Sequence, residues 1–244
     1  MNIVEPRVEL IAHTSLACNG RSPVIENYMS LDPDAGDAQQ LVEFAGRACY
    51  QSWEKPNPAT AKNADYIART LHEQKHFSIA EHATATFYIT GVSRALTHEL
   101  IRHRHLSYSQ LSQRFVDEKD AKVVLPPAIR DSNVEVMDFD KDLDPCMVPA
   151  DLFLKDAMDD ASFQYGSLVD ALTASGLPRK QAREAARAVL PNMTETRIVV
   201  TGNMRAWHEV IARRTAPDAD AEFQQVAGLI RDELKKIAPA IFTD

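Results

Sequence analysis

The sequence contains few glycines, and their scarcity excludes two common ways of binding nucleotides. Only 8 of the 244 residues are glycine, and no two of them lie close together. A Rossmann fingerprint and a P-loop both need clustered glycines, because bare backbone N–H groups must approach the phosphates. Any nucleotide that this chain binds must therefore be held mainly by side chains.

Long apolar runs and paired cysteines are also missing. No stretch is apolar for long enough to cross a bilayer, and charged residues within the first seven positions interrupt the place where a secretory signal needs an apolar core. The three cysteines, Cys18, Cys49 and Cys146, are odd in number and far apart, which is typical of a reducing compartment. We therefore expect a soluble, cytoplasmic protein.

The overall charge is negative, with 27 basic and 35 acidic residues and a formal net charge of −8. Nucleic-acid coats and polybasic membrane binders need a positive surface, so these two classes are excluded. The fractions of hydrophobic residues (45%) and charged residues (25%) are those of an ordinary globular domain. A phosphate would have to be held by a local cluster of basic side chains.

Hydrophobic periodicity predicts more helix than strand. Helices are predicted over residues 37–50, 60–74, 94–102, 151–175, 179–190, 203–214 and 218–237, with Ser93 expected to cap the third and Asn203 the sixth. Strands are predicted over 7–14, 82–90 and 194–201, a loop over 53–58, and Gly91 and Gly202 are expected to end the second and third strands. Residues 119–150 are acidic and weakly periodic, so we expect an irregular excursion within one domain spanning 1–244. The scattered strands indicate an α+β fold.

Residues 72–76 read HEQKH and match the HExxH zinc motif. Two histidines four apart on a helix can face one metal, with the intervening Glu73 as general base. His82 falls where the longer form of this motif has its third histidine ligand, but that form has glycine where this chain has Ile79. A β-branched residue is poor at the positive φ that such a turn needs. A zinc hydrolase using His72, Glu73, His76 and His82 stays open as an alternative to two ordinary histidines at a helix end.

A second cluster, RHRHLSYSQLSQR, runs from Arg102 to Arg114. Three arginines and two histidines within this stretch repel one another unless an anion lies among them. Arginine forks match phosphate oxygens, and the serines and glutamines add neutral donors. A solvated basic helix end would explain Arg102 and Arg104 but not the polar run that follows. The cluster therefore predicts an anion site, which a non-catalytic nucleotide- or RNA-binding module would also contain.

One more arginine faces the apolar side of the predicted helix over 203–214. Trp207, Val210, Ile211 and Arg214 follow helical spacing on one face, whereas Arg213 turns away. A cation that faces the interior needs an anion, which is either an acidic neighbour or a ligand.

These segments resemble the flavin-dependent thymidylate synthase family. The stretch from Arg102 to Arg114 matches the signature of RHR, seven residues and S-x-R. Residues 76–82 (HFSIAEH) resemble the family's H-x-S-x-x-E-H element, and residues 91–94 (GVSR) lead into the signature helix as in relatives. The C-terminal third fits through Arg187 before Leu190-Pro191, through residues 203–205 (NMR) and through Arg214.

The resemblance implies an α+β fold with a central, mostly antiparallel sheet flanked by helices. It implies an enzyme that makes dTMP from dUMP, with methylenetetrahydrofolate as carbon donor and NADPH as hydride source by way of FAD. It also implies a homotetramer whose active sites borrow residues from several subunits. A protein nucleophile is not needed in this route, so Cys146, which follows Pro145 but precedes no histidine, is interpreted as a bystander.

The resemblance also implies the site residues, and it implies no metal. FAD would be contacted by Ser78, Arg102, His103, Arg104, Gln110, Asn203, Met204, Arg205 and Glu209. The dUMP would be held by Glu99, Leu100, Ile101, Arg102, Gln110, Leu111, Ser112, Gln113, Arg114, Arg187 and Arg214. Arg214 would lie against the pyrimidine and favour ionisation at N3, which makes it the expected catalytic residue. The chain departs from relatives at Phe115, where they often have Tyr, and at Glu209, which follows His208 where His or Asn is common.

Overall fold

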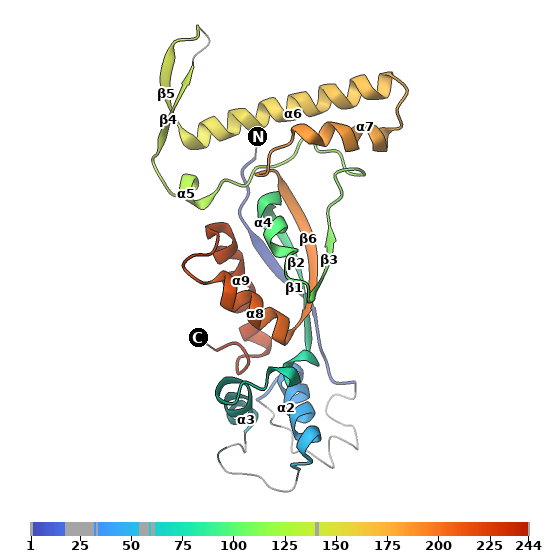
Figure 1. Cartoon of the computed structure of the whole chain (residues 1–244), viewed down its shortest axis with the longest axis vertical. Helices are drawn as coiled ribbons and strands as arrows, with labels where there is room; N and C mark the ends of the chain where they lie inside the picture. Colours follow the sequence, from blue (N-terminus) through green and yellow to red (C-terminus); the bar gives the residue numbers. More distant parts are fainter. Residues whose placement is uncertain are drawn as a thin grey trace.

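A four-stranded antiparallel sheet forms the centre of the molecule (Figure 1). The computed structural model describes residues 2–17, 32, 34–53, 59, 62–139 and 142–243, so Cys18 and most of the predicted 53–58 loop lie outside the described residues. The strand order is β1-β2-β6-β3, and each neighbouring pair is antiparallel. The strands are β1 (Arg7–His13), β2 (Thr84–Ser93), β6 (Glu195–Asn203) and β3 (Leu106–Gln110). The expected α+β class with an antiparallel sheet is confirmed.

One face of this sheet carries the main hydrophobic core. Alternate residues of the two central strands, such as Phe87 of β2 and Val200 of β6, are fully buried, because successive side chains of a strand point to opposite faces. Helices α8 (Met204–Arg214) and α9 (Ala221–Ile237) lie on one side of the sheet (Figure 1). Trp207 of α8 packs edge-on against Phe87 at 5.1 Å and donates its indole N–H to the Ala85 carbonyl at 3.1 Å.

The two glycines that were expected to end strands lie inside them, so both expectations are wrong. Gly91 adopts a φ of 66° at a register shift between Ile89 and Val92, and β2 then continues to Ser93. Gly91 therefore lies in a β-bulge, and the strand continues past it. Gly202 lies in β6, where an added Cβ would collide with the Leu106 side chain of β3. This glycine permits a close approach of two strands instead of making a turn.

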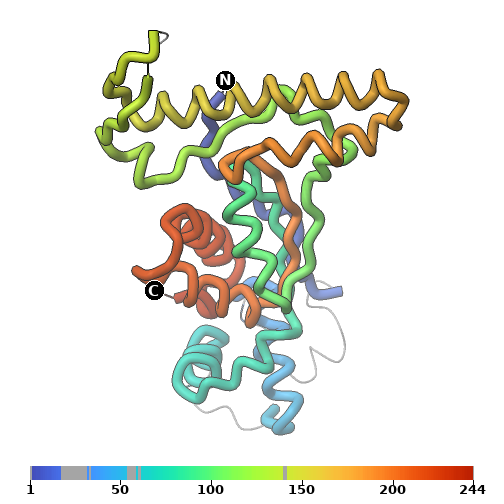
Figure 2. Tube along the Cα trace, turned by 45° about the horizontal axis from the view of Figure 1, so that its top comes forward, coloured from blue at the N-terminus to red at the C-terminus, as the bar shows by residue number. Residues whose placement is uncertain are grey.

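Helix α2 (Asp37–Tyr50) and three short helical segments form the lower part of the molecule (Figure 2). The bounds of α2 are those predicted. The predicted helix over 60–74 is instead α3 (Asn63–Ile67) followed by a π-helix (Ala68–Glu73), and a 3₁₀ helix (Phe77–Glu81) leads to β2. The C-terminal turn at Ala240 is held by hydrogen bonds to the π-helix and to α2. His72 Nε2 lies 2.8 Å from the Ala240 carbonyl oxygen, and the Ala240 N–H donates to Gln39 Oε1 at 2.8 Å.

The upper layer contains the long helix α6 (Ala150–Ala174), α7 (Arg179–Ala186) and a 3₁₀ turn (Arg187–Val189). The expectation of an irregular segment over 119–150 is wrong. It contains α5 (Pro127–Arg130) and a hairpin of β4 (Glu135–Phe139) and β5 (Pro145–Pro149), which forms its own two-stranded sheet beside α6 (Figure 1). Both strands alternate between exposed and half-buried residues, so they lack the strong apolar alternation of a core strand.

Among the helices that the structure describes, none has both the length and the apolar character to span a membrane.

Candidate active site

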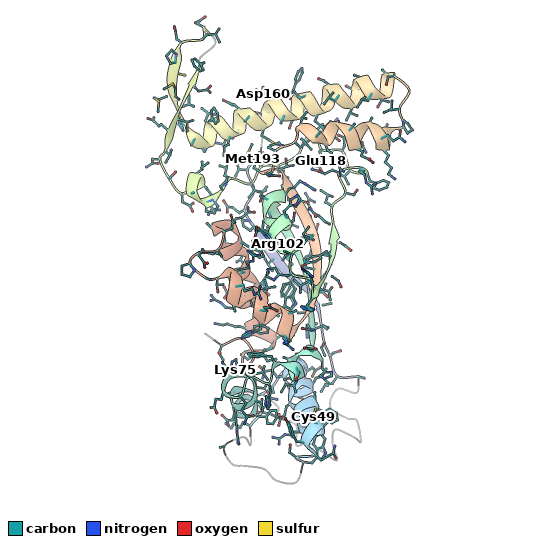
Figure 3. The ribbon with its side chains drawn as sticks, in the orientation of Figure 1. Cys49, Lys75, Arg102, Glu118, Asp160 and Met193 are labelled. Carbon is teal, nitrogen blue, oxygen red and sulfur yellow. The ribbon has the colours of Figure 1, made fainter. Side chains whose placement is uncertain are left out.

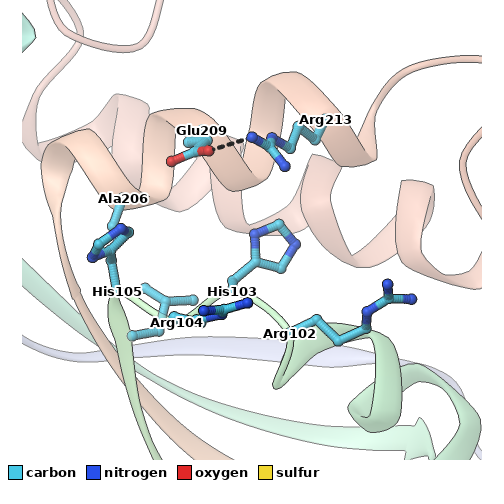
Figure 4. Close-up of a pocket in the computed structure, with 8 residues that line it drawn as sticks. Arg102, His103, Arg104, His105, Ala206, Glu209 and Arg213 are labelled. Atoms are coloured by element: carbon cyan, nitrogen blue, oxygen red, sulfur yellow. Dashed lines mark ion pairs between the residues drawn. The ribbon is translucent and has the colours of Figure 1, made fainter.

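Residues 102–114, which match the family signature, connect helix α4 (Arg94–Leu100) to strand β3 and continue beyond it. The first of these residues line a cleft at the junction of the helix and the strand. Helix α4 begins at Ser93, whose Oγ accepts the Leu96 N–H at 3.0 Å as the sequence predicted, and it ends just before the Arg102–His103–Arg104 run. The following strand β3 was missed, although Leu106 and Tyr108 alternate with serines. The cleft has a volume of about 270 Å³, and its walls are Arg102, His103, Arg104, His105, Leu106, Ala206, Glu209 and Arg213 (Figure 4).

Arg214 points inward on α8, as its helical position predicted. Its side chain is 18% exposed, whereas that of Arg213 is 68% exposed. The Arg214 guanidinium donates from Nη1 to Glu99 Oε2 at 2.7 Å and from Nε to His103 Nε2 at 3.0 Å. Its central carbon lies 4.7 Å from the centroid of the Phe223 ring. The interior cation thus has an acidic neighbour, and that neighbour is itself one of the residues expected to bind dUMP.

Glu209, the acidic departure from the family pattern, forms an ion pair within its own helix. Its carboxylate lies 2.6 Å from the Arg213 guanidinium, one helical turn away (Figure 4). The negative charge that would have opposed a phosphate at this cleft is therefore offset.

A second pocket of about 200 Å³ adjoins the cleft and shares His105, Ala206 and Glu209 with it. Asn203 and Arg205 line this pocket together with Glu81. Asn203 begins α8, as predicted, because its Oδ1 accepts the Ala206 N–H at 2.8 Å. Arg205 is bound to Glu81 at 2.5 Å, and the exposed Ser78 lies on the same 3₁₀ helix as Glu81. The Met204 side chain is fully buried in the core, so it presents no side-chain atom to the pocket.

The other expected dUMP residues lie at the far end of β3. Gln110 Nε2 donates to the hydroxyls of Thr97 at 3.1 Å and Thr196 at 3.2 Å. Gln113 is buried, and its Nε2 has no partner among the described residues. Arg114 is 44% exposed and lies 3.8 Å from Glu184 of α7. The remaining members of this part of the set are half-exposed or exposed: Leu111, Ser112 and Arg187.

Strand β3 therefore divides the expected dUMP residues into two groups. The first group contains Glu99, Arg102 and Arg214, with Leu100 in the core and Ile101 exposed beside them. The second group contains Arg114 and its neighbours near α7. The four residue steps from Leu106 to Gln110 span roughly 13 Å at about 3.3 Å per residue. Figure 3 shows the labelled Arg102 at the level of α4 and Glu118, just beyond Arg114, near the α6–α7 layer.

Phe115, the other departure from the family pattern, lies at a surface where two cations, Arg114 and Lys180, approach its ring. Its ring is 61% exposed, and Lys180 Nζ of α7 lies 4.9 Å from the ring centroid. The Arg183 guanidinium donates to the Phe115 carbonyl at 2.6 Å and to Asp117 at 2.8 Å. Lys180 and Arg183 were not singled out in the sequence, although both follow Pro178 on the helix that precedes Arg187.

Burial changes the acid–base behaviour of several groups around the cleft. Burial lowers the pKa of the His103 imidazole, and the nearby Arg214 and Arg213 charges lower it further. Burial likewise raises the pKa of the Tyr108 phenol to about 12. The Tyr108 hydroxyl lies 2.7 Å from both the Leu100 and the His103 carbonyl oxygens, so it fixes the turn between α4 and β3. Sequence reasoning did not identify Tyr108 or Phe223 as supporting residues.

The HExxH residues do not form the arrangement that zinc requires. The π-helix ends at Glu73, and Lys75 adopts a left-handed φ of 60°, so His76 lies beyond the helix that carries His72. His72 is already bonded to the Ala240 carbonyl. Within the described residues, no three His, Cys, Asp or Glu side chains gather closely enough to hold a metal ion. The structure thus gives the zinc hydrolase alternative no support.

The fold and the cleft together define the class of protein: an α+β protein with an antiparallel sheet, in which arginine and histidine side chains line a cleft at the junction of α4 and β3. The family model described as "Thymidylate synthase complementing protein" matches residues 31–240. The chain therefore belongs to the family of flavin-dependent thymidylate synthases, and it is an enzyme of that family.

Individual relatives agree with this assignment. The chain is 51% identical to the flavin-dependent thymidylate synthase of Mycobacteroides abscessus over 249 residues, covering 99% of this chain and 90% of that protein. It is 51% identical to the enzyme of the same name from Mycobacterium tuberculosis, covering 98% and 89%. The crystal structure of Thymidylate Synthase X from Helicobacter pylori with FAD and dUMP matches with a TM-score of 0.63 and 20% identity, over 98% of this chain and all of that one. That likeness concerns the fold.

Proposed function

We propose that this protein converts dUMP to dTMP with bound FAD, taking its carbon from methylenetetrahydrofolate and its hydride from NADPH. The observation that carries the proposal is the gathering of Arg102, His103 and Arg104 around one cleft, with Arg214 bonded to His103 behind it, in a protein of net charge −8. Such a concentration of positive charge is stable where an anionic ligand offsets it. Membership of the family supplies the identity of the ligands.

The side chains at the cleft fit FAD. The cleft and the adjoining pocket together present Arg102, Arg104, Asn203 and Arg205, which are donors suited to a pyrophosphate. Backbone phosphate cradles need clustered glycines, and this chain relies on side chains instead. When bound, FAD supplies the hydride chemistry, and the protein supplies binding and orientation.

Arg214 is the residue that we expect to act on the pyrimidine. Its guanidinium is fixed on three sides and little exposed, so it meets a substrate without first losing conformational freedom. A fixed positive charge beside the uracil ring favours loss of the proton at N3, because it stabilises the resulting anion. Arg114 and Arg187, with Ser112 and Gln113, are the groups that we expect at the phosphate.

We further propose that the enzyme is a homotetramer with active sites between subunits. The two groups of dUMP-binding residues lie at opposite ends of β3, so one protomer need not offer both to the same dUMP molecule. A second copy that faces the Arg214 end with its Arg114 end would complete the site. The free thiols of Cys49 and Cys146 are consistent with a cytoplasmic enzyme.

The activity is tested by tritium release from dUMP labelled at C5, in the presence of FAD, NADPH and methylenetetrahydrofolate. The purified protein should show a flavin absorption spectrum. Replacing Arg214 by Gln should lower turnover by a factor on the order of 100 or more, which is typical for loss of a fixed donor at a developing charge. Arg231→Gln, which removes the same charge from α9, is the matched control and should retain activity. A flavin-binding protein without tritium release would contradict the proposal and favour a non-catalytic nucleotide-binding module.

The shared site is tested by mixing two inactive variants. An Arg214→Gln protein and an Arg114→Gln protein each lack one end of the site, so mixed tetramers should contain some sites built from two unaltered ends. Co-refolding the two variants should therefore restore part of the activity, whereas each variant refolded alone should stay inactive. No recovery in tetramers shown by mass spectrometry to be mixed would contradict sites shared in this way.

A further inference from the structure

Arg214 is held by three groups that come from three different parts of the chain. Glu99 lies on α4, His103 lies in the turn between α4 and β3, and Phe223 lies in the first turn of α9. Phe223 is fully buried, and its ring face lies under the guanidinium at 4.7 Å. The ring of His103 lies edge-on to Phe223, with centroids 6.1 Å apart. Phe223 thus contacts both the arginine and the histidine.

The hydrogen bond between Arg214 and His103 restricts the protonation state of the histidine. An arginine Nε–H donates and has no lone pair to accept, so His103 Nε2 must be the acceptor. A histidine nitrogen accepts when it carries no proton, which requires a neutral ring protonated at Nδ1. A doubly protonated His103 would place two donors and two positive charges against each other at 3.0 Å.

We propose that His103 and Phe223 are positioning residues for Arg214, and that His103 fulfils this role as the neutral ring with its proton on Nδ1. Phe223 supports the planar guanidinium through its ring face, while Glu99 and His103 fix two of its edges. The inference rests on the proposed function in one respect, since it takes Arg214 as the group that meets dUMP.

The charges around His103 are consistent with this neutral state. From α8 it faces Arg214, Arg213 and Glu209, from α4 it faces Glu99, and from α9 it faces the uncharged Phe223. Burial is the largest cause that lowers its pKa, followed by Arg214 and Arg213, and the two carboxylates oppose them. The ring therefore stays neutral to a lower pH than an ordinary histidine, and acid conditions release Arg214 once the ring takes up a proton.

The tautomer is tested directly, without reference to activity. The ¹⁵N shifts of labelled histidine in the purified full-length protein, assigned by loss of the His103 signals in His103→Gln, report which ring nitrogen carries the proton. We expect His103 with a proton on Nδ1 and none on Nε2 at neutral pH. In Arg214→Gln, this preference should weaken and the pKa of His103 should rise by more than in Arg213→Gln. A wild-type His103 protonated at Nε2 would overturn the proposal even if the enzyme makes dTMP.

The role of Phe223 is tested with variants that separate its ring face from its apolar volume. Phe223→Leu should weaken dUMP binding roughly 3- to 30-fold, because the lost cation–π contact no longer holds Arg214 in place and the population of its binding position falls by about this factor. Phe223→Tyr keeps the ring face and should restore affinity to within about threefold of wild type, provided that the protein folds. Phe87→Leu, a fully buried phenylalanine of β2 that packs on Trp207, is the matched control for loosening of the core.

Thermal unfolding of each variant distinguishes loss of the fold from loss of positioning. Equal losses of dUMP affinity in Phe223→Leu and Phe87→Leu would assign Phe223 to the core alone and overturn its positioning role. The acid limb of kcat/KM for dUMP should also move toward higher pH in Phe223→Leu, since a less firmly held Arg214 protects the neutral His103 less. If wild-type protein binds no dUMP at all, the proposed function fails, while the tautomer measurement still decides whether the three groups hold Arg214.

Discussion

Replacing Glu118 by Gln should stabilise the protein at neutral and alkaline pH. Glu118 is 4% exposed, and its Oε1 accepts no hydrogen bond from any residue that the structure describes. Burial raises its pKa from 4.5 to about 7, with Arg94 opposing and Glu195 and Asp117 adding to the rise. The folded protein therefore binds this proton more tightly than the unfolded chain. The contribution of Glu118 to the free energy of unfolding therefore falls as the pH rises from about 4.5 to about 7.

The size of the effect follows from that difference in pKa. Holding the charged form costs about 3.4 kcal/mol at most, at about 1.36 kcal/mol per pH unit. Solvent and nearby charges screen part of this cost, so we expect Glu118→Gln to gain about 1–2 kcal/mol at pH 8. Glutamine keeps the shape of the protonated side chain but carries no charge, so the gain should disappear below about pH 4.5.

Urea unfolding of both proteins between pH 4.5 and 8 measures this gain. Glu135→Gln, which changes an exposed carboxylate of β4, is the matched control and should shift the unfolding free energy by less than about 0.5 kcal/mol at each pH. A Glu118→Gln protein that is equally or less stable than wild type at pH 8 would refute the reasoning. That result would mean that Glu118 is held as a carboxylate by groups such as Arg94.

Three other perturbations test separate features. Ser93→Ala removes the cap of α4 and the hydroxyl that donates to buried Glu222 at 2.6 Å, so urea unfolding should show a loss of about 2–3 kcal/mol, with Ser93→Thr losing less. Gly91→Ala places a Cβ against the Glu5 carbonyl at a positive φ, so it should lower the free energy of unfolding by more than about 2 kcal/mol. Gly228→Ala in α9 should raise it by about 0.5–1 kcal/mol, because the added Cβ meets no described atom within 4 Å. Burial lowers the pKa of His208 as well as that of His103, so the unfolded chain takes up these protons first and the contribution of the two histidines to the free energy of unfolding should fall as the pH drops below 6.5. His208→Gln should flatten that acid slope, and an unchanged slope would show that other groups produce it.

Local patterns in the sequence predict most of the helices and the inward direction of the Arg214 side chain. The bounds of α2 and the caps at Ser93 and Asn203 agree with the structure, because capping and apolar periodicity act over a few residues. The inward direction of Arg214 and the outward direction of Arg213 were predictable for the same reason.

Features that depend on distant parts of the chain were not predictable in this way. Strand β3 is stabilised by pairing with β6, which lies about ninety residues later, and its own five residues offer only Leu106 and Tyr108 as an alternating apolar pattern. A local pattern predicts a turn at Gly202, because the close approach of this glycine to Leu106 is a tertiary contact. The support of Arg214 by Phe223 likewise joins two helices whose packing no local pattern reveals.

The anchoring of the C-terminal turn has a consequence for how the molecule forms during translation. Ala240 bonds to Gln39 and His72, which precede it by 201 and 168 residues. The ribosome needs roughly 8–35 s to add 168 residues at about 5–20 residues per second. During that time α2 and the π-helix lack the C-terminal turn that bonds to them, so a nascent chain leaves this end of the molecule accessible to chaperones for at least that long.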